Sequence, residues 1–292
     1  MTASAHWPAV IVRSRRRIAA TYALAVVELA CETSYPWAVG VAIDGLLADR
    51  PRAMVPLVAI WVLHAAVGVA RQAYDTRLFT RLYAEAVTEM IDRQGRSGTS
   101  TAVLAGRSAL ARELVDFFER DVPALLTAIL GCVGSLALLT AYDARAGGVA
   151  LLMLVPVALL NWHYSRRAVV LNEAINDAAE EEVDIIASGH RPAVVEHFRH
   201  LARLRVRLSD AEARTWGITE LFSVATAIGA LFLLTTPTPT SPGHIFAAMT
   251  YLFAFIYGLD AVPNAVERTI QAYDIAARLS SEDDQPQPRK AL

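Results

Sequence analysis

The chain has 292 residues, of which 54% are hydrophobic, and its formal net charge at pH 7 is −2. This apolar share is higher than soluble globular domains usually carry, so the composition argues against a soluble protein and for a membrane protein. The nearly balanced charge gives no sign of nucleic-acid binding. The two cysteines, Cys31 and Cys132, lie in apolar runs without a disulfide or zinc pattern.

Six apolar stretches are long enough to cross a bilayer, which takes about twenty residues. No stretch alternates like a β-strand, so the sequence predicts an all-α membrane protein with six long transmembrane helices. We expect residues 1–17 to form a cytoplasmic N-terminal lead-in, residues 18–280 a six-helix transmembrane domain and residues 281–292 a flexible cytoplasmic tail. The predicted helices are Ile18–Leu47, Ala53–Ala70, Val122–Tyr142, Ala146–Ser165, Thr219–Thr236 and Ile245–Val262.

Basic residues are distributed unequally between the two sides of the predicted bundle. Of the 27 Lys and Arg residues, the three short loops carry Arg50, Arg52 and Arg145, and the remaining 24 lie with the long loops and the termini. Positively charged loops stay on the cytoplasmic side of a membrane. We therefore expect an integral protein of the cell membrane with both termini in the cytoplasm.

The two long loops, residues 71–121 and 166–214, keep charged and apolar residues at helical spacing. Each is interrupted by a Gly-containing segment, "GRSGTSTAVLAG" in the first and "SGHRP" in the second. We expect the membrane helices to continue into the cytoplasm, turn at these segments and return, which makes two cytoplasmic helical hairpins.

Five of the six predicted helices place a polar or ionisable residue at a similar depth. At a rise of about 1.5 Å per residue, these residues lie roughly 21–32 Å from the outer ends of their helices, near the inner edge of the hydrocarbon core. Charged side chains at such positions are costly and usually face a protein interior or a water-filled cavity. With His64 of the second helix, the candidate substrate-binding residues are Glu28, Glu32, His64, Arg71, Asp75, His163, Glu220 and Asp260.

Glu28 and Glu32 are four residues apart and share a helix face, and so do Arg71 and Asp75 on the next helix. We expect a contact between these acids and Arg71. Three interpretations stay open. The layer is a structural network of ion pairs between helices, or a cavity lining that meets a cationic or polar substrate or relays protons, or a set of side chains that reach the headgroups.

A second group of candidates lies in the second long loop, where His197 and His200 share a helix face. With Glu196 or His190, they could ligate a metal ion. Their spacing matches no strong zinc or di-iron signature. A basic cytoplasmic segment that touches headgroups or a partner protein is therefore the favoured interpretation.

Three stretches resemble the transmembrane domain of an ABC exporter. "YPWAVGVAIDGLL" resembles the end of that family's first membrane helix, "STAVLAGRSALARELVDFFERDVPALL" its first coupling region, and "GHIFAAMTYLFAFIYGLDAVPNAVERTIQAYDIAARL" its sixth helix with a cytoplasmic extension. The resemblance covers residues 10–280. It implies a half-transporter that pairs with a second copy, or with a homologous half-subunit, around a central cavity.

In most exporters an ATPase domain follows the sixth helix. The phosphate-binding pattern G-x-x-x-x-G-K-[ST] is absent here, and the only lysine is Lys290. We therefore expect no catalytic residue, no ATP-binding residue and no cofactor in this chain, which is then not an enzyme by itself.

The resemblance implies the membrane-spanning subunit of an ABC-exporter-like transporter, a dimer whose ATP is used by a separately encoded ATPase. The expected partners are that ATPase, a second half-subunit and the lipid bilayer, with no nucleic acid. The alternative is a non-transporting membrane scaffold or a membrane-embedded enzyme on the same fold.

Overall fold

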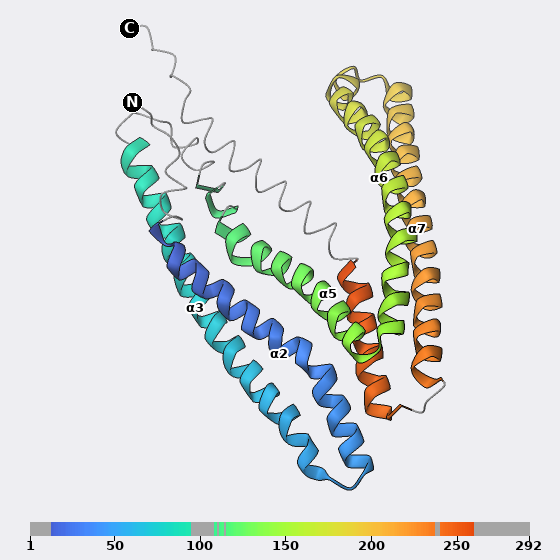
Figure 1. The fold of residues 1–292 in the computed structure, drawn as a ribbon. Helices are drawn as coiled ribbons and strands as arrows, with labels where there is room; N and C mark the ends of the chain where they lie inside the picture. The colour runs from blue at the N-terminus through green and yellow to red at the C-terminus, as the bar shows by residue number, and fades with distance from the viewer. Residues whose placement is uncertain (1–12, 95–107, 110, 114, 237–239, 260–292) are drawn as a thin grey trace. The chain divides into compact units, whose positions relative to one another are not determined.

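A computed structural model describes residues 13–94, 108–109, 111–113, 115–236 and 240–259 (Figure 1). These residues are helical with short turns and include no β-strand, which confirms the all-α prediction. The chain divides into two compact units, Met1–Leu138 with Thr240–Leu292 and Leu139–Pro239.

The first unit begins with α2 (Arg15–Leu47), the short 3₁₀ helix η1 (Pro51–Met54) and α3 (Val55–Gln94). A π-helical turn, η3 (Phe117–Asp121), leads into α5 (Val122–Tyr142), and the helix Pro242–Leu259 completes the unit. The bounds of α5 are the predicted ones. Asp49 has a φ of 54°, a conformation that aspartate tolerates better than most residues, and it turns the chain from α2 towards α3.

The second unit is a hairpin of two long helices, α6 (Ala144–Ala187) and α7 (Arg191–Thr235), which run side by side (Figure 1). The turn lies where the sequence predicts it, at Gly189, whose φ of 64° favours glycine. Pro192 then lies in the first turn of α7, where its missing N–H costs no hydrogen bond. The helical pairing is present, and its cytoplasmic location stays a prediction.

Five helices of the described part are long and apolar enough to cross a membrane, against six predicted. Glu28 and Glu32 lower the mean hydropathy of α2, which is not among the five although it has 33 residues. The turn of the first predicted hairpin, residues 95–107, lies outside the described residues, so that hairpin and the six-helix count stay predictions. The five are Pro51–Glu89, Ala111–Tyr142, Ala144–Ala187, Arg191–Thr235 and Pro242–Leu259.

The helix Pro242–Leu259 is tied to α2 at its N-terminus. The backbone N–H of Gly243 donates to Asp44 Oδ1 at 2.8 Å, and the Ser241 hydroxyl donates to Asp44 Oδ2 at 2.5 Å. Asp44 thus supplies from α2 the carboxylate that a helix N-terminus favours. One turn earlier, a Cβ on Gly40 would lie 2.5 Å from the Gly243 carbonyl oxygen, so the two backbones approach closely.

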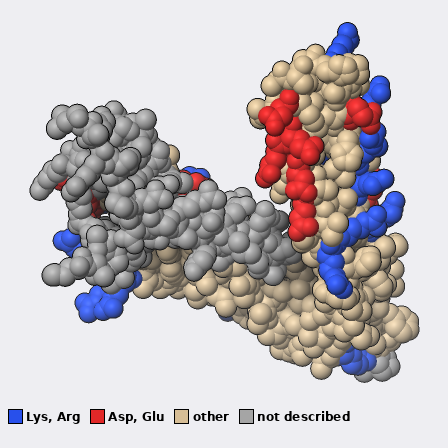
Figure 2. All heavy atoms as spheres, turned by 90° about the horizontal axis from the view of Figure 1, so that it is seen from above, with Lys and Arg blue, Asp and Glu red and all other residues tan. Residues whose placement is uncertain are grey.

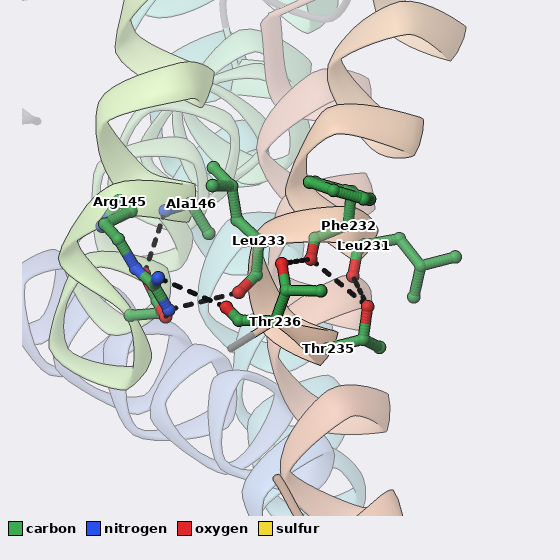
Figure 3. Close-up of polar contacts among 8 residues, drawn as sticks. Arg145, Ala146, Leu231, Phe232, Leu233, Thr235 and Thr236 are labelled. Carbon is green, nitrogen blue, oxygen red and sulfur yellow. Dashed lines mark hydrogen bonds and ion pairs between the residues drawn. The ribbon is translucent and has the colours of Figure 1, made fainter. Parts of the chain in front are cut away.

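In the second unit, Asp143 caps the N-terminus of α6, and Arg145 bonds the C-terminal end of α7 (Figure 3). Asp143 Oδ1 accepts hydrogen bonds from the backbone N–H groups of Arg145 and Ala146, at 2.8 and 3.1 Å, and so caps α6. The Arg145 guanidinium donates to the carbonyl oxygens of Leu233 at 3.1 Å and Thr236 at 3.2 Å. Carbonyl groups that α7 leaves without helical partners are therefore bonded by a cation on α6.

The close approach at Gly40 gives a stability prediction. Gly40→Ala should lower the free energy of unfolding by about 1–3 kcal/mol, because the added methyl group overlaps the Gly243 carbonyl. Melting curves of the purified protein in detergent measure the change. Gly134→Ala on α5 is the matched control, since its Cβ would meet nothing within 4 Å. An equal or smaller loss in Gly40→Ala than in the control would contradict the close contact.

Asp143 gives a prediction about pH. Hydrogen bonding from the Arg145 side chain holds the pKa of Asp143 below its ordinary value. A carboxylate with a lowered pKa stabilises the folded state above the unfolded pKa of about 4, and this contribution is lost as the pH falls through the folded pKa. Asp143→Asn keeps a capping side chain but loses the charge. Its melting temperature should therefore lie below that of the wild type at pH 7 and approach it in acid.

The size of the Asp143 effect should be modest, less than about 1 kcal/mol at pH 7, because Arg145 is half exposed. Asp177→Asn, on an exposed part of α6, is the control and should follow the wild type at every pH. A gap between Asp143→Asn and the wild type that is constant with pH would show that the charge is not the cause.

Candidate functional site

A row of ionisable side chains lies along the contact between α2 and α3. Residues 28, 32 and 35 of α2 follow the i, i+4, i+7 spacing of one helix face, and residues 64, 68, 71 and 75 of α3 do the same. Gly68 makes room on α3, because a Cβ there would lie 3.2 Å from Glu28 Oε1. We call the side chains that meet here the polar cluster: Glu28, Glu32, Tyr35, His64, Arg71 and Asp75.

Arg71 is the fixed cation of the polar cluster. Its Nε donates to Glu28 Oε2 on the neighbouring helix, and its NH1 donates to Asp75 Oδ2 at 3.2 Å on its own helix. The predicted contact between the α2 acids and Arg71 is therefore present, and it is made by Glu28. One guanidinium bridges two carboxylates that are both mostly buried.

His64 lies between the two glutamates. Its Nδ1 is 2.6 Å from the Tyr35 hydroxyl, and its Nε2 is 3.7 Å from Glu28 Oε1 and 3.8 Å from Glu32 Oε1. The Tyr35 ring lies edge-on to Trp61 with centroids 5.9 Å apart, which holds the phenol in place. The imidazole therefore faces both carboxylates of α2.

The charges of the polar cluster do not balance. Three carboxylates, those of Glu28, Glu32 and Asp75, meet one guanidinium and one histidine. Arg71 bonds Glu28 and Asp75, whereas within the described residues the ion-pair contact of Glu32 is the longer one with His64, and its side chain is 48% exposed. The cluster thus holds an excess of acidic side chains over the one arginine. It therefore attracts a proton or a cation, and Glu32 is the acid with room to meet one.

Glu32 also borders a cavity of about 200 Å³ between α2, α5 and the helix Pro242–Leu259. We call it the Glu32 cavity. Its walls are mostly apolar or small, with hydroxyl and thiol groups at a few points. The lining residues are Leu29, Glu32, Thr33, Pro36, Thr127, Ala128, Gly131, Cys132, Ser135, Tyr251, Ala254 and Gly258.

The remaining residues of the predicted layer are placed differently. His163 on α6 and Glu220 on α7 belong to the second unit, and both are exposed there. Asp260 lies outside the described residues. The common depth of the layer stays a prediction, while the structure brings together the five candidate site residues of α2 and α3.

The predicted metal ligands lie at the beginning of α7. Glu196 Oε1 accepts a hydrogen bond from Arg203 at 2.8 Å, and the buried His197 ring lies 5.3 Å from the ring of Phe198. His190 and His200 are exposed. Within the described ranges, no three His, Cys, Asp or Glu side chains come together in a way that could hold a metal ion. The metal site stays a prediction, and the described residues offer it no cluster of donor side chains.

Sequence reasoning missed Tyr35 and the Glu32 cavity. Tyr35 lies three residues after Glu32 and seven after Glu28, so helical spacing could have placed it on the same face. The cavity had no such signal, because Cys132 and Tyr251 come from helices far along the chain.

The bridging role of Arg71 can be tested by removing it. Arg71→Met leaves Glu28 and Asp75 without their cation, and should lower the free energy of unfolding by on the order of 2 kcal/mol. Adding Glu28→Gln should recover part of the loss, as a double-mutant cycle of melting curves would measure. Arg77→Met is the control, because Arg77 is exposed and its NH1 bonds the Ala73 carbonyl of its own helix. Equal effects of Arg71→Met and Arg77→Met would contradict the bridge.

Comparison with known proteins adds to this geometry. The family model described as "ABC transporter transmembrane region" matches residues 9–255, and no ATPase-domain family was found in the chain. No curated protein matches it. The match covers most of the chain and includes all the residues of the polar cluster. The chain therefore belongs to the ABC transporter transmembrane region family, and the resemblance found in the sequence is confirmed.

Proposed function

We propose that the chain is the membrane-spanning subunit of an ABC-exporter-like transporter, and that it acts as a dimer with a separately encoded ATPase. The observation that carries the proposal is the family match over residues 9–255. These 292 residues contain no phosphate-binding loop that could hold ATP, so the ATPase of this proposal lies outside them.

The exposed surface of the helices supports the membrane location and the dimer. In the helix Pro51–Glu89, which overlaps α3, no residue of the most apolar segment is buried. Trp61, Val62 and Val69 are more than 60% exposed. A surface of this kind needs lipid or another subunit against it. Exporter halves that pair around a central cavity would cover part of it.

The lengths of α6 and α7 support a partner outside the bilayer. They have 44 and 45 residues, about 65 Å each, and a bilayer core accounts for about 30 Å.

Acidic and basic side chains gather on opposite sides of this hairpin (Figure 2). The exposed acids of α6 follow helical spacing at Glu173, Asp177, Glu180 and Asp184, and the exposed basic residues of α7 are Arg199, Arg203, Arg207 and Arg214. Patterned charges of this kind suit a polar protein partner.

The polar cluster fits the same function. An excess of negative charge inside membrane helices is expensive unless it holds the helices together or meets a ligand. We assign the bridge of Glu28, Arg71 and Asp75 to helix packing and Glu32 to the transport pathway. This division follows the partners of the acids. Arg71 bonds Glu28 and Asp75, whereas the Glu32 side chain is about half exposed.

Purification of the chain from its native membranes tests the proposal. The chain should elute as a dimer by light scattering and should bring an ATPase subunit that mass spectrometry identifies. In proteoliposomes the complex should hydrolyse ATP, and a variant of the ATPase without its phosphate-binding lysine should not. A dimer that brings no ATPase and moves no solute across the liposome membrane with ATP would favour the alternative, a non-transporting scaffold or a membrane-embedded enzyme.

A further inference from the structure

The Glu32 cavity has the features of a binding site for a small organic cation. We propose that it binds an alkylammonium or quaternary ammonium group of about the size of choline, with the Glu32 carboxylate as the counter-charge. That this cation is cargo rests on the proposed function, but the binding itself does not.

The first argument is the charge at the cavity. Arg71 bonds Glu28 and Asp75, so its charge is already shared between two carboxylates. Glu32 lines the cavity with a contact of 3.8 Å to His64 and no closer ion pair among the described contacts. An ionised carboxylate between membrane helices favours a positively charged neighbour. The cavity is the space next to Glu32 in which such a neighbour fits.

The second argument concerns the hydroxyl and thiol groups of the lining, which belong to Thr33, Thr127, Cys132, Ser135 and Tyr251. The Thr33 hydroxyl donates to the Leu29 carbonyl at 2.9 Å, and the Tyr251 hydroxyl donates to the Thr33 carbonyl at 2.9 Å. The Cys132 thiol lies 3.9 Å from the Phe255 carbonyl, to which it donates. Three of the five groups therefore already donate to backbone oxygens and offer little to an anionic ligand, whereas a cation needs acceptors.

Pro36 interrupts the backbone hydrogen bonding of α2 next to Glu32. Proline has no N–H, so the carbonyl oxygen of Glu32, four residues earlier, receives no hydrogen bond from it within α2. Glu32 and Pro36 both line the cavity. The residue that would supply the counter-charge therefore also has a backbone carbonyl that Pro36 leaves without its usual helical donor.

The third argument concerns the walls, which favour an organic cation over a metal ion. Leu29, Ala128, Gly131 and Ala254 offer apolar or small surfaces suited to methyl and methylene groups. A calcium ion takes six to eight oxygen ligands, whereas the described lining has a single carboxylate. Recognition of quaternary ammonium groups commonly combines a counter-charge with apolar or aromatic walls, and Tyr251 adds an aromatic ring here.

Equilibrium binding of radiolabelled choline to the purified full chain in nanodiscs tests the proposal, without ATP or an ATPase. The wild type should bind choline saturably. An excess of 3,3-dimethylbutan-1-ol, which has the same shape without the charge, should not displace it. Glu32→Gln should weaken binding by about tenfold, because it removes the only carboxylate among the described lining residues and with it the counter-charge of the cation. Glu212→Gln on α7, which removes a carboxylate outside the cavity, should leave the affinity unchanged.

Two further variants separate binding from folding. Ala128→Leu fills the cavity and keeps every charge, so it should also weaken choline binding while Glu32 stays intact. Glu32→Asp keeps the charge and should retain more affinity than Glu32→Gln. The proposal is overturned if the wild type does not bind choline saturably, if the neutral alcohol competes equally, or if both Glu32→Gln and Ala128→Leu bind like the wild type. Absence of an ATPase partner would contradict the proposed function and leave this result unchanged.

Discussion

The bridge from Glu28 through Arg71 to Asp75 is the interaction on which the first unit depends. It joins α2 to α3 across their contact. Burying two carboxylates and a guanidinium costs desolvation energy that hydrophobic contacts would not. The gain is a defined register, because a shift of one residue along either helix would separate the charges.

This register has consequences along α2. It sets Glu32 and Tyr35 opposite His64. Glu32 therefore lies beside the ion bridge without a contact to Arg71 among the described ion pairs. Further along the same helix, Pro36 borders the cavity, and Gly40 and Asp44 receive the helix Pro242–Leu259. A single helix therefore carries the ion bridge, the cavity wall and the cap of a distant helix. Its acids also explain why α2 is less apolar than a typical membrane span.

Much of the architecture could be predicted because it depends on local periodicity. The bounds of α5, the continuous helices that extend beyond the membrane spans and the turn at Gly189 all follow from hydrophobic pattern and glycine conformation. The contact of Glu28 with Arg71 could also be predicted, since adjacent helices joined by a short loop pack antiparallel. The choice of Glu28 over Glu32 could not, because it depends on the space that Gly68 leaves on α3.

By itself, the sequence determined the helical membrane class, the family and the presence of ionisable residues within apolar helices. These follow from composition, spacing and motif order, which need no knowledge of distant contacts. Only the tertiary structure decided that Glu28 and Asp75 share Arg71 and that Glu32 contacts His64. It also decided that a cavity lies beside Glu32. The Glu32 cavity joins residues of α2, α5 and the helix Pro242–Leu259. Packing between helices separated by about a hundred residues or more has no local signature, since it is set by side-chain volume and close backbone approach rather than by periodicity.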